Sequence, residues 1–143
     1  MSIELSFTVP GEAVGKGRPR ISTRGGFARA YTPAKTVAYE KVVAECAAKA
    51  MADAGLELFD CPLAVIINIG KEPPKSWSGV KRVKAINGDV YPGKPDLDNI
   101  CKGVLDAMNN VVYIDDALIV RLVVTKRYTD ISCVDINVRE YLK

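Results

Sequence analysis

A helix followed by a long strand is predicted by residues 94–128, KPDLDNICKGVLDAMNNVVYIDDALIVRLVVTKRY. We expect the helix to run from residue 98 to residue 108 or 109, because its apolar residues recur at four-residue spacing and therefore face one side. These inward-facing residues are Ile100, Val104 and Met108. The run ALIVRLVVTKRY at 117–128 is rich in β-branched residues and predicts the strand.

A second strand, SCVDINVREY at 132–141, is predicted directly downstream. Thr129 and Asp130 begin a tight connection between the two strands, and a short connection of this kind is typical of a hairpin. We therefore expect the strands at 117–128 and 132–141 to pair with each other.

Two further strands and a long helix are predicted upstream. Residues 3–9, IELSFTV, alternate apolar and polar side chains, which is typical of a half-buried strand. Residues 63–70, LAVIINIG, are apolar almost throughout, which indicates a strand in the interior of a sheet. Between them, Thr32 as the N-cap and Pro33 at the first helical position open a long helix that Gly55 closes.

The segments that connect these elements are predicted to be surface loops. Residues 10–31 mix Gly and Pro with Lys and Arg and form a basic loop. Residues 71–94 carry paired prolines, a basic bias and a short helical stretch that opens near Ser76 or Ser78. The run GEAVGKG at 11–17 lacks the spacing and the Ser or Thr of a phosphate loop, so no nucleotide cofactor is expected.

Taken together, the elements predict a single α+β domain over residues 1–143, with a small mixed sheet of about four strands and helices packed on one face. No apolar run approaches the roughly 20 residues that span a bilayer, so we expect no membrane partner. The first residues lack the basic and apolar regions of an export signal, so a cytoplasmic location is expected.

The composition excludes several classes of enzyme. There is no histidine, which removes Ser-His and Cys-His nucleophiles, imidazole bases and His-ligated metal sites. The four cysteines form no CxxC pair and match no zinc-finger spacing. Hydrolytic chemistry in this chain must therefore use carboxylates, lysines and hard metal ions.

The two signs of charge are segregated along the chain, although the net charge is only +3. Residues 13–35 hold six basic residues and no acid, whereas residues 95–116 hold five acids and one base, Lys102. A basic region that holds phosphates, together with carboxylates that hold a divalent metal, is what an enzyme that cuts phosphodiesters needs. The basic segment read alone is equally well explained as a solvated face.

The acids are spaced as metal ligands. Asp96 and Asp98 are two residues apart in what we expect to be an extended approach to the helix, so both carboxylates address one ion. Lys102 follows one helical turn later on the same face, and only one of Asp115 and Asp116 is expected to point at the site. Oxygen ligands without His or Cys favour Mg²⁺, with Mn²⁺ as a substitute.

A structural interpretation of the same residues is also available. Asp98 is then a helix N-cap, Lys102 is its ion-pair partner one turn away, and Asp115 and Asp116 are turn residues. Each assignment is common singly, but it is uncommon for all of them to occur together in one short stretch.

Residues 94–128 resemble the signature of the RusA family of Holliday junction resolvases, which are often found in phages and prophages. The matching elements are Asp-Leu-Asp-Asn at 96–99, Lys102, Leu105-Asp106-Ala107, and Asp115-Asp116-Ala117 leading into a strand with Lys126. The order of the preceding elements is also similar. The departure lies in residues 71–94, which are longer here than in short members of the family.

The resemblance implies a homodimer that uses Mg²⁺ to nick two strands of a four-way DNA junction symmetrically. It implies that Asp96, Asp98 and Asp116 are the principal metal ligands, Asp115 an auxiliary ligand and Lys102 the catalytic lysine. The DNA arms would be held by the bases of the loop: Lys16, Arg18, Arg20, Arg24 and Arg29.

Two alternatives predict a different behaviour. A restriction-like nuclease would need an acid two residues before a lysine, and no such triplet occurs in the chain. A non-catalytic phage protein that binds branched DNA would use the acids in a structural or regulatory role. It predicts binding without metal-dependent cutting.

Overall fold

The computed structural model describes residues 3–17 and 20–143. Three helices and six strands occur in this part of the chain, together with two short 3₁₀ turns. The elements in chain order are β1 (Glu4–Pro10), β2 (Arg20–Ser22), η1 (Arg24–Gly26), β3 (Arg29–Tyr31), α1 (Ala34–Ala54), β4 (Leu63–Lys71), α2 (Gly79–Ile86), α3 (Leu97–Met108), η2 (Asp116–Leu118), β5 (Ile119–Tyr128) and β6 (Cys133–Glu140).

Four strands form one mixed sheet in the order β1-β6-β4-β5. β4 is an interior strand, parallel to β5 and antiparallel to β6, as its continuous apolar sequence predicted. Along β4, Leu63, Val65 and Ile67 are fully buried. The fold is therefore α+β with a mixed four-stranded sheet, in agreement with the sequence-based prediction.

The predicted hairpin between the last two strands is wrong, because β4 lies between β5 and β6. The connection from β5 to β6 passes over the end of β4, where Thr129 N donates to Lys71 O at 2.9 Å. Gly70 makes this passage possible, since a Cβ atom there would collide with Thr129. The sequence identified both strands correctly but assigned them the wrong neighbours.

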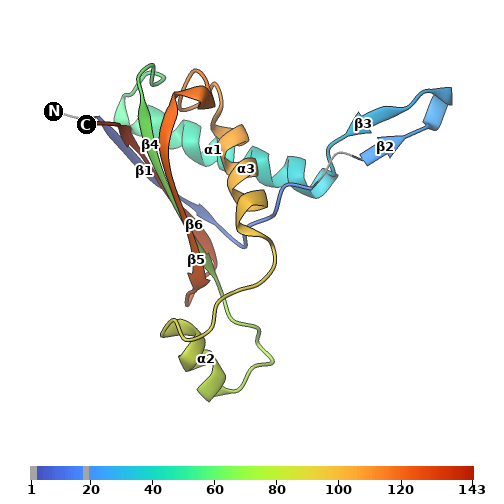
Figure 1. The fold of residues 1–143 in the computed structure, drawn as a ribbon, viewed down its shortest axis with the longest axis vertical. Helices are drawn as coiled ribbons and strands as arrows, with labels where there is room; N and C mark the ends of the chain where they lie inside the picture. The colour runs from blue at the N-terminus through green and yellow to red at the C-terminus, as the bar shows by residue number, and fades with distance from the viewer. Residues whose placement is uncertain (1–2, 18–19) are drawn as a thin grey trace.

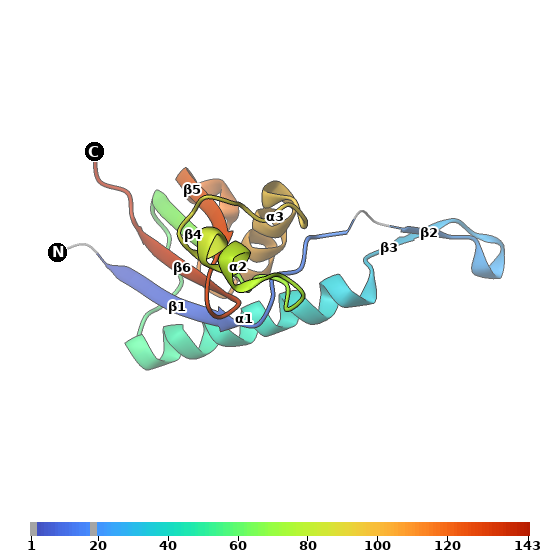
Figure 2. The ribbon, with the colours of Figure 1, turned by 90° about the horizontal axis from the view of Figure 1, so that it is seen from below.

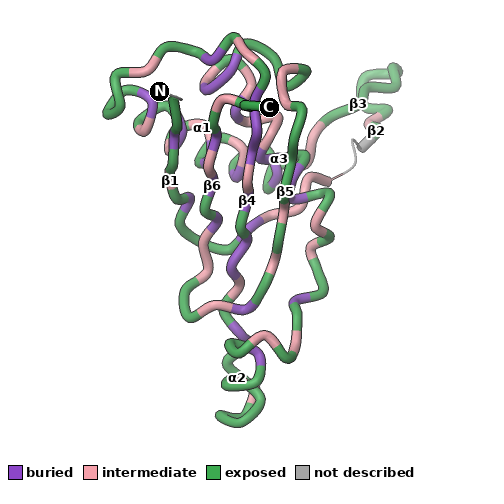
Figure 3. The backbone as a smooth tube through the Cα atoms, turned by 60° about the vertical axis from the view of Figure 1, so that its left-hand side comes forward, coloured by how far each residue is buried: buried purple, intermediate pink, exposed green. Residues whose placement is uncertain are grey.

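Helices α1 and α3 cover one face of the sheet, as Figure 2 shows. Ile100, Val104 and Met108 of α3 are buried against the core, which confirms the predicted inward face. Figure 3 shows buried residues concentrated along β4, β6 and the facing sides of these helices. The opposite face of α3 is left free to carry polar side chains.

Both long helices begin close to the predicted residues, with small corrections. Helix α1 starts at Ala34 with Pro33 at the N-cap position, so Thr32 is not the cap. Gly55 closes α1 in the left-handed conformation at φ 64°, as predicted. Helix α3 starts at Leu97, one residue earlier than expected, with Asp96 at the N-cap position.

The predicted basic loop contains a two-stranded hairpin that projects from the body beside the start of α1 (Figure 1). We call residues 20–31 the arm. β2 and β3 are only three residues each, too short for an alternating pattern to be recognised, and Gly25 and Gly26 turn the chain with positive φ. The arm has exposed apolar as well as basic side chains, with Ile21 73 % and Phe27 72 % exposed.

Residues 71–94 form a second projection, which carries α2 (Figure 1). Ser78 caps α2 by accepting from Lys81 N, so of the two predicted start residues, Ser76 and Ser78, the helix uses the second. Trp77 packs edge-on against Tyr128 of β5, with the ring centroids 5.2 Å apart. Lys126 of β5 donates hydrogen bonds to the carbonyl groups of Gly93 and Pro95. No helix in the described residues is long and apolar enough to cross a membrane.

Candidate functional site

A pocket of about 450 Å³ lies between α3 and β5. Four charged side chains line it: Asp98, Lys102, Asp106 and Asp116. Its remaining walls are largely apolar, formed by Leu97, Cys101, Leu105, Leu122 and Val124. Carboxylates and a lysine therefore meet at an open surface pocket whose other lining residues are apolar.

Helix α3 places three of the four charged residues. Asp98, Lys102 and Asp106 are spaced by four residues, so they stand on one side of the helix in successive turns. The buried residues on the other side of α3 fix how the helix rotates against the core. The predicted common face of Asp98 and Lys102 is confirmed by their shared place in the pocket.

The fourth charged residue, Asp116, comes from η2, directly before β5. Its backbone N–H donates to Asn109 Oδ1 at 3.0 Å. The neighbouring Asp115 is used differently, because its Oδ1 accepts from Ala117 N at 2.9 Å and caps η2. Of the two adjacent acids, Asp116 lines the pocket and Asp115 stabilises the turn.

The electrostatics of the pocket favour a bound cation. Partial burial, the adjacent Asp115 carboxylate and the charge of Asp106 raise the pKa of Asp116 above its usual value, while the Asn109 side chain opposes this. Like-charged carboxylates raise one another's pKa because each destabilises the ionised form of the other. A divalent ion would remove this repulsion.

Asp96 lies apart from the pocket and lines a neighbouring one with Lys35, Lys94 and Asn99. Its Oδ1 accepts from Lys94 Nζ at 2.8 Å, and this contact lowers the pKa of Asp96. The predicted juxtaposition of Asp96 and Asp98 assumed an extended chain. The chain is not extended there, because Leu97 already begins the helix, and Asp96 and Asp98 line different pockets.

The donor set can be compared with the coordination that Mg²⁺ prefers. Within residues 3–17 and 20–143, no three His, Cys, Asp or Glu side chains come close enough to share one metal ion. Mg²⁺ is commonly held by one or two carboxylates together with waters and substrate phosphate. Asp98 and Asp116 on one pocket fit that mode of binding.

The structural interpretation holds for the turn, which Asp115 caps and Asp116 begins, but not for Asp98 and Lys102. The helix N-cap position is taken by Asp96 and not by Asp98, and Asp96 makes no capping hydrogen bond there. No ion pair joins Asp98 to Lys102 among the described residues. Asp98 and Lys102 thus make none of the contacts that a purely structural role would require.

The five bases predicted to hold DNA are found in different environments. Arg24 and Arg29 are exposed on the arm. Arg18 lies outside the described residues, and so does the side chain of Arg20, whose backbone belongs to β2. Lys16 differs from the prediction, because its ammonium group faces α1 and α3 and is paired with two carboxylates.

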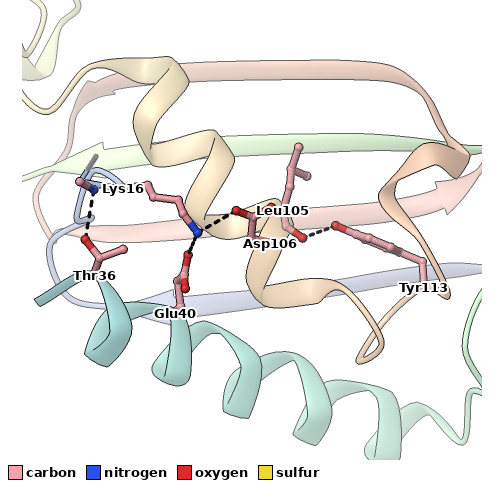
Figure 4. Close-up of polar contacts among 7 residues, drawn as sticks. Lys16, Thr36, Glu40, Leu105, Asp106 and Tyr113 are labelled. Carbon is pink, nitrogen blue, oxygen red and sulfur yellow. Dashed lines mark hydrogen bonds and ion pairs between the residues drawn. The ribbon is translucent and has the colours of Figure 1, made fainter. Parts of the chain in front are cut away.

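The partners of Lys16 are Glu40 of α1 and Asp106 of α3, shown in Figure 4. No pattern in the sequence predicted that Lys16 would pair with either carboxylate. The only local signal is that glycines flank Lys16, at positions 15 and 17, which indicates a close approach of backbone to neighbouring elements.

Comparison with known proteins identifies the family of the chain. Residues 10–139 match the family model for endodeoxyribonuclease RusA. The chain belongs to the RusA endodeoxyribonuclease family. The match includes the whole acidic pocket and the arm, and thus nearly the entire chain. RusA is a family of nucleases. Membership therefore favours a nuclease over the alternative of a DNA-binding protein without catalytic activity.

A curated relative resembles this RusA-family chain along almost its whole length. It is the uncharacterized protein YqaN of Bacillus subtilis (strain 168), which is 37 % identical over 139 residues. The alignment covers 95 % of this chain and 96 % of the relative. The two proteins are therefore similar over almost their whole length.

Proposed function

We propose that this protein is a Mg²⁺-dependent endonuclease that nicks four-way DNA junctions symmetrically as a homodimer, with Mn²⁺ as a possible substitute. The observation that carries the proposal is the pocket in which Asp98 and Asp116 meet Lys102 in a RusA-family chain. Carboxylates and a lysine at one pocket supply the ligands and the cation that phosphodiester hydrolysis requires.

In this proposal Asp98 and Asp116 are the principal metal ligands. Asp96 would join them by leaving Lys94. That step costs little, because the side chains of Lys94 and Asp96 are 85 % and 50 % exposed and solvent screens ion pairs at the surface. Asp115 would act as an auxiliary group, by keeping η2 in the conformation that directs Asp116 into the pocket.

The bound ion would supply Lewis-acid activation of water and neutralise charge on the reacting phosphate. Lys102 stands one helical turn from Asp98 and would stabilise negative charge that develops on the scissile phosphate or the leaving oxygen. Asp98, Lys102 and Asp116 are all exposed, so a phosphate that enters the pocket could reach each of them.

The arm would hold DNA outside the pocket. Arg24 and Arg29 are free to contact phosphates, and we propose the same role for Arg18 and Arg20. Two identical pockets related by a two-fold axis would cut opposed strands of a junction that is itself two-fold symmetric. This arrangement would account for symmetric nicking.

A nicking assay tests the proposal. The wild-type protein is incubated with a synthetic four-way junction and with a linear duplex of the same sequence, in Mg²⁺, in Mn²⁺ and in excess chelator, and nicks are mapped on every strand. We expect paired nicks on opposed junction strands, only with metal, and little cutting of the duplex. Binding of the junction without metal-dependent cutting would refute the proposal, and unpaired nicks would refute the symmetric dimer.

The Asp98→Asn, Asp116→Asn double variant is the control for contaminating nuclease. Both substitutions keep the size of the side chain and remove only the charge. Any cutting that persists at the wild-type rate in this variant does not come from the pocket.

A further inference from the structure

Lys16 forms a bridge between the two long helices. Its Nζ lies 2.7 Å from Glu40 Oε1 of α1 and 2.8 Å from Asp106 Oδ2 of α3 (Figure 4). The contacts are sheltered, since the side chains of Lys16, Glu40 and Asp106 are only 20 %, 22 % and 34 % exposed. This environment differs from that of the exposed arginines of the arm.

Burial alone would lower the pKa of Lys16, but the hydrogen bonds and charges of Asp106 and Glu40 outweigh burial and raise it. The amine is therefore charged at neutral pH. One cation faces two carboxylates at this position, and only one of the two, Asp106, also lines the pocket of Asp98 and Asp116.

The backbone around Lys16 is held as closely as its side chain. Lys16 N donates to Asn99 O at 2.9 Å, and Gly17 N donates to Thr36 Oγ1 at 3.1 Å. A Cβ at Gly15 would approach Pro95 to 2.9 Å, and a Cβ at Gly17 would approach Pro33 to 2.9 Å. The segment that leads into the arm is thus fixed on the starts of both α1 and α3.

We propose that Lys16 is a positioning residue of the nuclease pocket and not a DNA contact: by pairing with Asp106 it compensates the third carboxylate of the pocket, so that Asp98 and Asp116 alone present free negative charge. The inference rests on the proposed function. Glu40 completes the arrangement from α1 and holds the ammonium group in place.

The charge balance explains why this pairing matters for catalysis. Asp106 stands one helical turn beyond Lys102, and its charge acts on Asp116. Without Lys16, an uncompensated Asp106 would draw a cation toward the wrong end of the pocket and repel the phosphate that has to enter. Lys16 therefore acts on the reaction through Asp106.

The test removes the charge of Lys16 and then removes each partner in turn. We compare Lys16→Met, Lys16→Met with Asp106→Asn, and Lys16→Met with Glu40→Gln. The two double variants delete one carboxylate each from the same ionic cluster, but only Asp106 lines the pocket. Lys16→Arg tests rescue by a conservative change, and Lys35→Met controls for the loss of an exposed cation nearby.

Two quantities are measured well below the unfolding temperature: the single-turnover rate at saturating junction, and Mn²⁺ binding by titration calorimetry without DNA. We expect Lys16→Met to bind Mn²⁺ more tightly and to cut about tenfold more slowly, as expected for one unbalanced charge near the site. Asp106→Asn should restore both values, Glu40→Gln should restore neither, and Lys16→Arg should retain most of the rate.

Three results would overturn the inference. Equal rescue by Asp106→Asn and Glu40→Gln would make Lys16 a purely structural residue. A weaker affinity for DNA, with a salt slope reduced by about one and no rescue, would make it a phosphate contact. An unchanged Lys16→Met protein would leave it without a role. If wild-type protein cuts no DNA the proposed function fails, whereas the Mn²⁺ titrations still decide whether Lys16 acts through Asp106.

Discussion

The pocket and the arm carry charges of opposite sign on frameworks of different kinds. In the pocket, the acids of α3 stand on a helix whose other face is packed, with Val104 and Met108 at 0 % exposure. In the arm, the arginines stand on two three-residue strands in which Ile21 is 73 % exposed. The first framework fixes side chains in space, and the second leaves them free to follow a ligand.

This contrast matches two different physical tasks. Chemistry at phosphate needs groups held within a few tenths of an ångström, which a helix fixed by its core contacts can supply. Holding the backbone of DNA needs charge that tolerates different geometries, since phosphate contacts carry affinity and not sequence information. We therefore expect changes in the pocket to alter rate, and changes in the arm to alter affinity.

The largest effect is expected from Asp116→Asn or Asp98→Asn. Loss of a metal ligand should lower the single-turnover rate by more than about 10³-fold, because several kcal/mol of charge stabilisation are removed. Junction binding should be unchanged or slightly tighter, since a negative charge near phosphate is lost. Gel-shift and single-turnover assays on one junction measure both. Asp115→Asn, which only weakens the cap of η2, should be milder.

Lys102→Ala should come next, with a rate lower by about 10²–10³-fold. The lysine has no carboxylate partner among the described residues, so its charge is available to the reacting phosphate. Metal affinity, read from the Mn²⁺ dependence of the rate, should barely change. If metal affinity falls as much as the rate, Lys102 only organises Asp98.

Neutralising the arm with Arg24→Gln and Arg29→Gln should weaken binding of junction and duplex alike. The slope of log K against log salt should fall by about two, because each lost phosphate contact removes close to one released counterion. The rate at saturating enzyme and the unfolding temperature should stay at wild-type values. Lys49→Gln, on α1 and paired with Asp53, serves as the control. An unchanged salt slope would show that the arm faces away from DNA.

The smallest effect is expected in the core, where loss of the hydroxyl should change the free energy of unfolding differently at two buried tyrosines. Tyr113 donates its hydroxyl to Leu105 O at 2.6 Å, whereas Tyr39 OH is buried without a hydrogen-bond partner among the described residues. Tyr113→Phe should lower the free energy of unfolding by about 1 kcal/mol, and Tyr39→Phe should leave it unchanged or raise it. Chemical denaturation measures both, and equal losses would contradict the assignment.

The same tyrosines should determine how the free energy of unfolding decreases at alkaline pH. Burial raises the pKa of Tyr39 to about 12 and also raises the pKa of Tyr113. The folded protein therefore retains these protons where the unfolded chain releases them, so stability is full below about pH 10 and declines as the pH rises further. Each Phe variant should flatten this decline. A steeper decline in either variant would contradict the conclusion that folding raises the pKa of that tyrosine.

Local patterns in the sequence were sufficient for the elements but not for their partners. The inward face of α3 and the interior position of β4 followed from periodicity and continuous apolar character. Strand order did not, because short connections favour hairpins and nothing local reveals that β4 separates β5 from β6. The passage over Gly70 that makes this order possible depends on tertiary contact.

The site was predictable to a similar degree. Helical spacing placed Asp98 and Lys102 together, and the expectation that only one of Asp115 and Asp116 faces the site holds, with Asp116 in the pocket. The position of Asp96 was predicted wrongly, because the helix begins at Leu97 and the chain is not extended between Asp96 and Asp98. Lys16 and Asp106 are 90 positions apart, so no local pattern could reveal their pairing.

The central claim is that the pocket determines the cutting rate and the arm determines the affinity for DNA. It is tested most directly by measuring both quantities on one four-way junction for two variants. These are Asp116→Asn and the Arg24→Gln, Arg29→Gln double variant, each beside wild type with Mg²⁺. The account predicts that the pocket variant binds like wild type and does not cut, while the arm variant binds weakly and cuts at the wild-type rate once saturated. Loss of affinity in the pocket variant together with loss of saturating rate in the arm variant would contradict it.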